Sequence, residues 1–274
     1  MEIPMDNLRY PKKGNREISP HRPGLENLLA SADLKKAELA SLRPLQPLAV
    51  KSLVAAYDLE LMVASNQIEG NSLTLRETQL VLEKGITIGG KPLKDHIDAI
   101  NLDTAWKLAK SLVENKIPIT EAVCLELHKI ILTRIDDDNA GRYRRERVFI
   151  LASKHIPPNP LKLPELLQKT WSEFAAAGET NLYNHPICKL AKRHHAITSI
   201  HPFVDGNGRT ARLLLNLGLA QAGFPPAQIL TQNKLEYYNA LENVDTGKDP
   251  QAFNRYIAGA VNASLDKYLV ALKN

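Results

Sequence analysis

The sequence is poor in cysteine, in aromatic residues and in long apolar runs, and each shortage excludes a class of protein. Its 274 residues include two cysteines, Cys124 and Cys188, which lie in apolar helical patterns without the spacing of a metal site or a disulfide framework. We interpret both as buried thiols in a reducing compartment. Aromatic residues make up 5% of the chain, which argues against a β-sandwich or barrel. The sequence contains no run of about 18 apolar residues, so no membrane-spanning helix is predicted.

The sequence also lacks a signal peptide and a concentrated basic region. Residues 1–20, MEIPMDNLRYPKKGNREISP, contain no continuous apolar segment, so we expect a soluble, cytoplasmic protein with no membrane partner. The net charge of +5 is scattered, and the densest basic run, GRYRRERV, is preceded by the acidic DDD. A nucleic-acid-binding face needs clustered positive charge, so we expect no nucleic-acid partner.

What the sequence does contain is a succession of apolar residues with helical spacing, and 44% hydrophobic content is enough for a substantial core. Helices are predicted over residues 25–41, 46–69, 75–84, 91–115, 120–134, 163–177, 186–200, 209–222, 232–243 and 250–272. Thr74 and Glu77 form a capping box, Gly85 ends the same helix, and Thr120 begins another. The predicted fold class is therefore all-α.

Two segments depart from the helical pattern. Residues 1–24 are rich in Pro, Arg and Lys without a period, which predicts an extended N-terminal arm. The run Val148–Leu151 is compatible with a strand and too short for a helix, which predicts a small β-hairpin flap. The remainder is divided into N-terminal helices over residues 25–90 and a core with C-terminal helices over residues 91–274. No Gly/Ser-rich linker separates these parts, so we expect them to pack as one globular unit.

The stretch His201–Arg212, HPFVDGNGRTAR, places several chemically active residues at the mouth of a predicted helix. Pro202 prevents the preceding helix from continuing, so His201 is expected at a turn, and the next helix is expected to start near Arg209. The two glycines of the Gly-Asn-Gly triplet allow backbone N–H groups to converge on an anion, which the helix dipole also favours. This combination predicts a phosphate cradle.

The charged side chains of the stretch point to the same chemistry. Arg209 and Arg212 share a helix face and can each bind phosphate oxygens, although each cation opposes the dipole by about 0.3–1 kcal/mol. A phosphate would repel Asp205 unless a divalent cation such as Mg²⁺ lies between them. A neutral His201 could accept a proton from an attacking hydroxyl. The structural alternative is a helix corner in which His201 bonds a backbone carbonyl and the arginines pair with surface acids.

The stretch resembles the Fic family pattern H-x-F-x-D/E-G-N-G-R-x-x-R. The matching residues are His201, Phe203, Asp205, Gly206, Asn207, Gly208, Arg209 and Arg212. The resemblance extends over residues 91–243, including GRYR at Gly141–Arg144 and the pair Tyr237 and Tyr238. It implies a Fic-type helical bundle and an enzyme, a protein adenylyltransferase. Such an enzyme moves AMP from ATP to a Ser, Thr or Tyr hydroxyl of a target protein and releases pyrophosphate.

The resemblance also implies a role for each site residue. His201 would be the catalytic base, and Asp205 would hold Mg²⁺ against the α- and β-phosphates. The implied nucleotide-binding residues are Gly206, Asn207, Gly208, Arg209, Thr210, Arg212 and Tyr238. The triplet would cradle the phosphates, the two arginines would hold the β- and γ-phosphates, and the tyrosine would border the adenine. The flap would register the target segment by strand-like pairing.

A second motif, SNQIEGN at Ser65–Asn71, ends the long helix predicted before it. One interpretation is an ordinary helix end, with Gly70 as the C-cap and Glu69 as a surface acid. The dipole disfavours a carboxylate there, however, so Glu69 needs a partner. The segment resembles the family's inhibitory pattern S/T-x-x-x-E-G/N with Ser65 and Glu69 in register, which implies pairing of Glu69 with Arg212. That pairing would compete with the γ-phosphate and misplace the α-phosphate for in-line attack.

Two other hypotheses remain open at this point. An enzyme on the same scaffold could remove AMP from a modified target, with Glu69 positioning water, or a silent nucleotide-binding or interaction protein could retain the site. The intact His201 argues against the silent protein. The Gly-Asn-Gly triplet and Asp205 favour AMP transfer over the family members that transfer phosphate. Self-modification and a homodimer are left open, and the sequence does not identify the target, the modified residue or the trigger that displaces Glu69.

Overall fold

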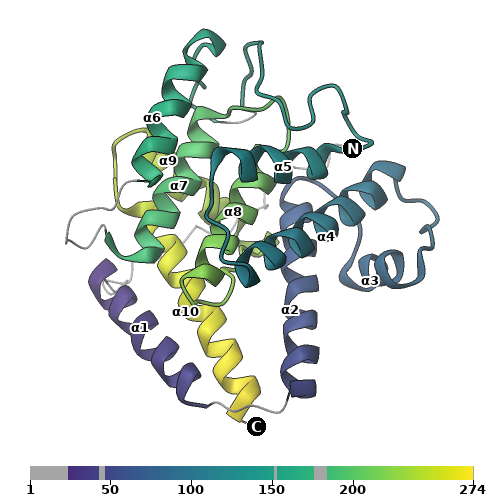
Figure 1. Ribbon diagram of the computed structural model, residues 1–274, viewed down its shortest axis with the longest axis vertical. Helices are drawn as coiled ribbons and strands as arrows, with labels where there is room; N and C mark the ends of the chain where they lie inside the picture. Colours follow the sequence, from purple (N-terminus) through teal and green to yellow (C-terminus); the bar gives the residue numbers. More distant parts are fainter. Residues whose placement is uncertain (1–23, 43–46, 151–152, 176–183, 274) are drawn as a thin grey trace, which may run out of the picture.

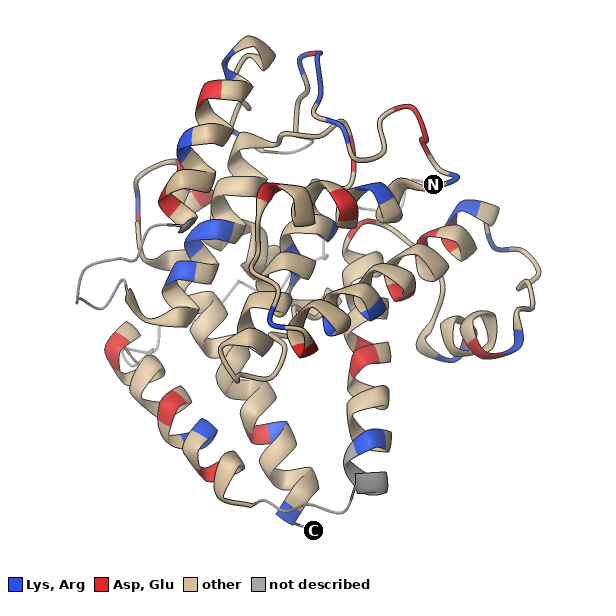
Figure 2. Cartoon of the chain, in the orientation of Figure 1, with Lys and Arg blue, Asp and Glu red and all other residues tan. Residues whose placement is uncertain are grey.

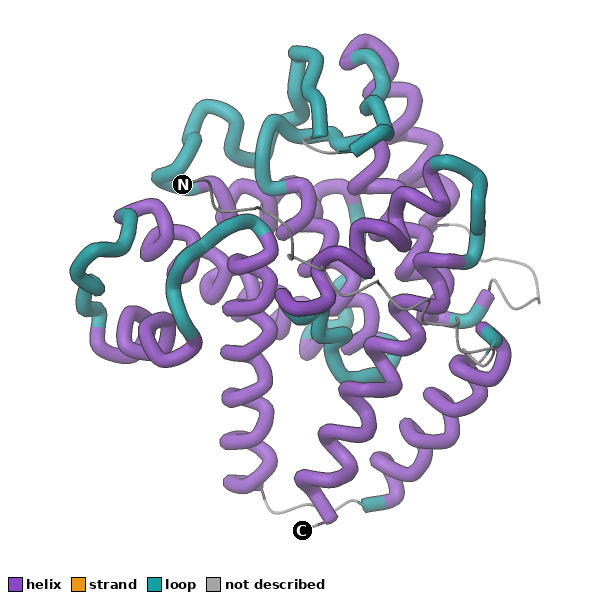
Figure 3. Tube along the Cα trace, turned by 180° about the vertical axis from the view of Figure 1, so that it is seen from behind, coloured by secondary structure: helices purple, strands orange, loops and turns teal. Residues whose placement is uncertain are grey.

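The computed structural model describes residues 24–42, 47–150, 153–175 and 184–273, and within these ranges the regular structure is helical (Figures 1 and 3). The helices are α1 (Leu25–Ser41), α2 (Pro47–Ile68), α3 (Leu75–Lys84), α4 (Leu93–Glu114), α5 (Glu121–Leu132), α6 (Leu163–Ala175), α7 (Pro186–Ile200), α8 (Asn207–Gln221), α9 (Lys234–Asp245) and α10 (Ala252–Lys273). The predicted all-α class is confirmed. Residues 1–23 of the predicted N-terminal arm lie outside the described residues.

Local capping signals determine both ends of α3 and the start of α5. The Thr74 hydroxyl accepts the N–H of Glu77 at 3.2 Å, and the Glu77 carboxylate accepts the N–H of Thr74 at 2.8 Å, which completes the capping box of α3. Gly85 ends that helix in the left-handed conformation with φ of 64°. Thr120 accepts the N–H of Val123 at the start of α5. These predicted boundaries are confirmed.

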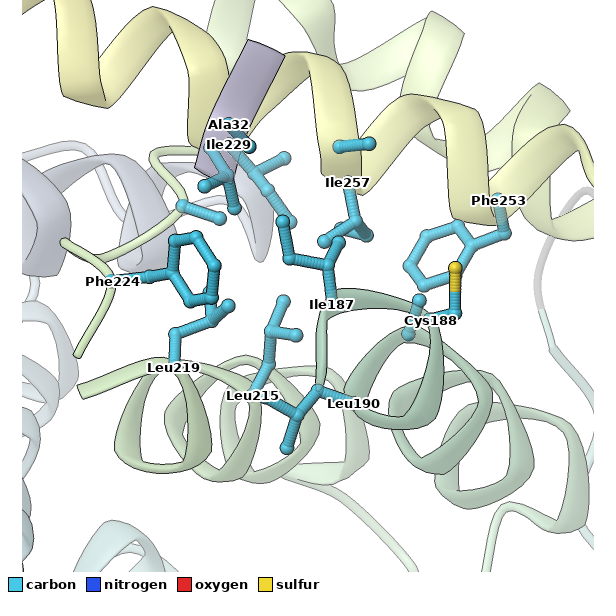
Figure 4. Packing of buried hydrophobic residues seen from close by; sticks show 14 of the residues in the cluster. Ala32, Ile187, Cys188, Leu190, Leu215, Leu219, Phe224, Ile229, Phe253 and Ile257 are labelled. Atoms are coloured by element: carbon cyan, nitrogen blue, oxygen red, sulfur yellow. The ribbon is translucent and has the colours of Figure 1, made fainter. Parts of the chain in front are cut away.

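Two hydrophobic clusters both include residues of α8. The first joins α1, α7, α8 and α10. Several of its members are labelled in Figure 4, among them Ile187, Leu215, Leu219 and Ile257. The second joins α2, α4, α5 and α8 through residues that include Leu61, Trp106, Leu127, Phe203 and Leu214. Between Asn207 and Leu219, all residues of α8 except Gly208 are buried. Helix α8 is therefore held by packing against both clusters.

The first and last described helices lie side by side, with α1 along α10 (Figure 1). The side chain of Asn262 on α10 donates to the carbonyl of Leu28 at 2.8 Å and accepts from the hydroxyl of Ser31 at 2.8 Å. In the view of Figure 2, basic and acidic residues are interspersed over the outer helices. Within the described ranges, no helix combines the length and the hydropathy needed to cross a bilayer.

The β-hairpin predicted for the flap is not seen. In the part of the chain that the structure describes, Val148–Ile150 lies in a loop, and no strand is present (Figure 3); Leu151 is outside the described residues. The side chains of Phe149 and Ile156 are exposed, so a hairpin here would have no hydrophobic face to pack. The ends of the loop are fastened instead by the side chain of Arg144, which donates to backbone carbonyls.

Candidate active site

His201 follows the last residue of α7 in the left-handed conformation, with φ of 50°. This conformation is uncommon outside glycine and is often found at functional sites. The ring Nδ1 lies 3.2 Å from the carbonyl of Thr198. Because a carbonyl can only accept, Nδ1 carries the proton, and the lone pair of Nε2 is left as the base. Burial lowers the pKa of His201, and the positive charge of Arg144 acts in the same direction, so the imidazole is neutral at physiological pH.

The loop between His201 and α8 is closed by the side chain of Asn207. Its Oδ1 accepts the N–H of Phe203 at 2.9 Å, and its Nδ2 donates to the carbonyl of Phe203 at 2.9 Å. Gly206, with φ of 78°, is the N-cap residue, so α8 begins at Asn207 rather than near Arg209 as predicted. The side-chain amide of Asn207 is used within the loop, and only its backbone N–H faces the mouth of the helix.

His128 on α5 supports this loop and was missed by the sequence analysis. Its Nε2 donates to the carbonyl of Asp205 at 2.9 Å, and its Nδ1 accepts the N–H of Gly141 at 2.9 Å. The ring stacks on Phe203 with 3.6 Å between centroids. Burial lowers the pKa of His128 to about 4, which keeps the ring neutral. A Cβ at Gly206 would lie 3.3 Å from this ring, so glycine satisfies both the close approach and the positive φ.

The first turn of α8 presents backbone N–H groups to an anion. The N–H of Thr210 already donates to the carbonyl of Gly206 at 2.9 Å, and the N–H of Gly206 is bound by the Asp205 carboxylate at 2.6 Å. The N–H groups of Asn207, Gly208 and Arg209 come before the first intrahelical bond and point along the dipole. The Thr210 side chain is fully buried, and its hydroxyl has no partner among the described residues.

Arg209 is buried, with 3% of its side chain exposed, and it bridges two carboxylates. It pairs with Asp98 on α4 and, at 3.1 Å, with Asp205. The other oxygen of Asp98 accepts from Lys94 at 2.8 Å. Asp98 was not predictable as a site residue, because it is 111 residues from Arg209 in sequence and stands in no motif. Arg209 thus fixes the position of Asp205, and its predicted contact with phosphates stays a prediction.

Arg212 contacts the second motif directly. Its Nε donates to the Ser65 hydroxyl at 2.9 Å, and its Nη2 donates to the Ser65 carbonyl at 2.9 Å and to the Glu69 carboxylate at 2.7 Å. Glu69 and Arg212 therefore form the ion pair that the resemblance implies. The Nη1 of Arg212 is buried without a partner within the described residues, and it lies beside Gly208. An anion oxygen at this point would supply the missing hydrogen bond.

Tyr238 on α9 lies near the Glu69–Arg212 pair and is 40% exposed. Burial raises the pKa of its hydroxyl, and the negative charge of Glu69 acts in the same direction. The preceding residue, Tyr237, is buried, and its hydroxyl lies 3.2 Å from Nε2 of His194. The structure thus brings together His201, the α8 mouth, Arg212, Glu69 and one face of α9.

The residues at the mouth of α8 suit a metal ion that is shared with a nucleotide. Mg²⁺ commonly binds through one or two carboxylates, with substrate phosphates and water as its other ligands. The Asp205 side chain is 56% exposed and has lone pairs beyond those that bind Gly206 and Arg209. Within the described residues, no three His, Cys, Asp or Glu side chains are grouped to hold a metal by themselves. The donor set fits an ion held jointly by Asp205 and phosphates.

Comparison with known proteins identifies a family and several relatives to which the chain is similar. The model of the Fic/DOC family matches residues 118–219. Proteins named protein adenylyltransferase Fic from Drosophila willistoni and Drosophila melanogaster are each 35% identical over 246 residues, which is 90% of this chain and 48% and 49% of those proteins. The chain thus spans about half the length of the curated relatives it matches.

Solved structures share the arrangement of helices. Fic-1 from C. elegans has a TM-score of 0.80 at 32% identity, over 91% of this chain and 73% of that chain. A Fic domain containing signaling protein from Bacteroides thetaiotaomicron has a TM-score of 0.80 at 28% identity, over 89% of this chain and 97% of that chain. Both similarities extend well beyond the twelve-residue stretch to most of the described helices.

Proposed function

The chain belongs to the Fic/DOC family, and on that premise we propose that it is a protein adenylyltransferase, which moves AMP from ATP to a hydroxyl side chain of a target protein. The observation that carries the proposal is the meeting of two groups at one helix mouth. A neutral His201 with a free Nε2 stands at one side, and the N–H groups of α8 with the incompletely paired Arg212 stand at the other. The names of the relatives support the same activity.

In the proposed reaction, Nε2 of His201 accepts the proton of the target hydroxyl as that oxygen attacks the α-phosphorus. The bond between the α-phosphorus and its bridging oxygen breaks, and pyrophosphate leaves. The hydrogen bond from Nδ1 to Thr198 orients the ring and stabilises the imidazolium that forms. The backbone N–H groups of Asn207, Gly208 and Arg209 hold phosphate oxygens in the orientation that in-line attack requires.

Asp205 would hold the metal ion of this site. When bound, Mg²⁺ supplies positive charge that offsets the negative charge on the phosphates. Arg209 keeps the Asp205 carboxylate in place from one side, and the N–H of Gly206 does so from the other. Arg209 would itself add positive charge near the phosphates, and Tyr238 would border the adenine from α9.

The same geometry supports autoinhibition by the second motif. Ser65 and Glu69 together occupy Nε and Nη2 of Arg212, which would otherwise hold the γ-phosphate. ATP would then bind with its α-phosphate displaced from the line of attack. The loop over residues 145–158 would hold the target segment by main-chain pairing and adopt strand-like structure when the target is bound.

Transfer of label from ATP tests the proposed function. With label in the α-phosphate, Glu69→Gly is expected to modify protein about 10- to 100-fold faster than the parent, because the triphosphate regains Arg212. Label in the γ-phosphate should not be transferred. Glu114→Gly, which removes an exposed glutamate from the end of another helix, is the matched control and should match the parent. No transfer of α-label by any of these proteins would refute AMP transfer.

A second candidate activity, removal of AMP from a modified target, has one specific observation in its favour. Glu69 is 35% exposed, and of its two carboxylate oxygens only Oε1 makes a hydrogen bond within the described residues. The other oxygen could orient a water molecule for hydrolysis. Incubation with a target that already carries AMP distinguishes the two activities, because Glu69→Gly should abolish removal but increase transfer.

A further inference from the structure

Arg144 stands at the start of the loop over residues 145–158, and only 3% of its surface is exposed. Its guanidinium donates to the carbonyls of His201 at 2.7 Å, Glu146 at 2.7 Å, Pro158 at 2.7 Å and Ile200 at 3.5 Å. Its backbone N–H donates to the carbonyl of Pro202 at 2.9 Å. One side chain therefore joins the end of α7 to both ends of the loop over residues 145–158.

The charge of Arg144 is balanced in an unusual way. Within the described residues it forms no ion pair with a carboxylate, and burial lowers its pKa. A buried cation without compensation is costly. The compensation comes from carbonyl oxygens, and two of them, at Ile200 and His201, lie at the C-terminal end of α7, where the dipole favours positive charge. The guanidinium thus caps the helix that carries the proposed catalytic base.

We propose that Arg144 is a positioning residue for the transfer reaction: it holds the backbone of His201 and both ends of the loop over residues 145–158 in one arrangement. The catalytic part of this inference rests on the proposed function. His201 has a positive φ, a conformation that costs free energy and persists only where its surroundings impose it. The bond from Nε of Arg144 to the His201 carbonyl is one of the contacts that impose it. Without that bond, rotation of the peptide group would move the imidazole.

Arginine and lysine differ in a way that separates charge from geometry at this position. The guanidinium presents five N–H donors in a rigid plane, whereas lysine has one flexible ammonium group. Arg144→Lys keeps the positive charge but cannot reach carbonyls of three segments at once. Arg144→Met removes the charge as well. Arg142→Lys is the matched control, because Arg142 lies two residues earlier with an exposed side chain.

Kinetics in the Glu69→Gly protein give the first measurement. Arg144→Lys is expected to lower kcat about 10- to 100-fold, since small misplacements of a catalytic group have effects of this size. The KM for ATP should change by less than about twofold, because the hydrogen bonds of Arg144 among the described residues do not include the phosphate cradle at Gly206–Gly208. Arg142→Lys should leave both constants unchanged. If the substitution only reduced the amount of folded protein, the concentration of active sites would fall, but kcat per active site would stay the same.

The pH profile gives a readout that a purely structural role would not change. Burial and the charge of Arg144 lower the pKa of His201, whereas the hydrogen bond to the carbonyl of Thr198 raises it. The negative charges of Glu69 and Asp205 also raise this pKa. Arg144→Met removes one of the two influences that lower it. The base is active when neutral, and the acidic limb of kcat should therefore move to higher pH in Arg144→Met and less in Arg144→Lys. If Arg144→Met does not fold, Arg144→Lys decides the question through kcat and the exchange experiment below.

Amide hydrogen exchange on the protein without nucleotide tests the inference apart from activity. Arg144→Lys should speed exchange in residues 145–150, 153–158 and 201–206 and leave α1 and α10 unchanged. Unchanged exchange in these three segments, or an unchanged kcat in a protein that transfers AMP, would overturn the inference. If Glu69→Gly transfers nothing, the proposed function fails, and the exchange result alone decides whether Arg144 couples His201 to the loop.

Discussion

At the scale of single residues, most polar side chains of the site are held by two or more partners. Asn207 binds both backbone groups of Phe203, and Arg209 binds Asp98 and Asp205. His128 donates through one ring nitrogen and accepts through the other. Side chains held in this way keep one orientation before a ligand arrives, which reduces the reorganisation that binding or catalysis requires.

The buried pair of Asp98 and Arg209 gives a prediction at this scale. Asp98→Ala leaves a buried guanidinium with a single, half-exposed carboxylate, so the free energy of unfolding should fall by about 3–5 kcal/mol. Urea denaturation followed by circular dichroism measures the change. The control is Asp103→Ala on the same helix, where the partly exposed pair with Lys107 should be worth less than about 1 kcal/mol. Equal losses in the two variants would contradict the structural role given to Asp98.

At the scale of elements, the sequence predicted the helices well and the contacts between them poorly. Apolar spacing and capping residues are local, so both ends of α3 and the N-cap of α5 at Thr120 could be placed to the residue, whereas the end of α5 was predicted two residues too late. The start of α8 was misplaced by two residues, because the bond between the Asn207 side chain and Phe203 depends on the folded loop. The hairpin was predicted from a β-compatible run, but strand formation needs a partner strand and a face to pack, which that loop lacks.

His128 shows why part of the site could not be predicted from the sequence. It lies on the apolar side of α5, 77 residues from the carbonyl of Asp205 that it binds. Its neighbours along the chain give no motif, and a buried histidine in an amphipathic helix is more often a core residue than a ligand. Its support of the motif loop becomes visible only when α5 and α8 pack together.

The second prediction concerns the pH dependence of the contact that His128 makes between α5 and the loop. Its pKa of about 4 in the folded protein lies below the usual 6.5, so the unfolded chain binds a proton first as the pH falls. Stability is therefore lost as the pH falls from about 6.5 towards 4. By pH 4.5, protonation of His128 in the unfolded chain should have lowered the free energy of unfolding by about 2–3 kcal/mol. Gln can donate and accept but does not titrate.

The measurement for this prediction is the free energy of unfolding of the parent and of His128→Gln between pH 7.5 and pH 4.5. The stability of the parent should fall more steeply than that of the variant, by the amount stated above, whatever the difference between them at neutral pH. Parallel curves for the two proteins would show that His128 is not kept neutral by burial in the folded state.

At the scale of the whole molecule, the chain is closed by contacts between segments that are distant in sequence. The helices α1 and α2 follow one another, yet α1 packs on α10 while α2 packs on α4 and α8 (Figure 1). Apolar spacing shows which face of a helix is buried but not which helix covers it, so this arrangement was not predictable from the pattern. It matters for the site, because the packing of α2 brings Glu69 to Arg212.

The third prediction concerns the polar contact that joins α1 to α10. Asn262 is 7% exposed and binds Leu28 and Ser31 on α1. Asn262→Ala should lower the free energy of unfolding by about 1–3 kcal/mol, because it leaves buried polar groups without partners. Asn115→Ala, which removes an exposed asparagine, should cost less than about 0.5 kcal/mol. A loss no larger than that of the control would mean that α1 is held by its apolar contacts alone.

The central claim is that one site, with His201 as its base and Glu69 as its restraint, transfers AMP to protein hydroxyl groups. The most direct test is mass spectrometry of a cell lysate incubated with ATP, Mg²⁺ and the Glu69→Gly protein. We predict an adenylyl group on Ser, Thr or Tyr side chains, and none when the added protein also carries His201→Ala but still binds ATP. Absence of adenylyl groups, or the same groups with His201→Ala, would contradict the account.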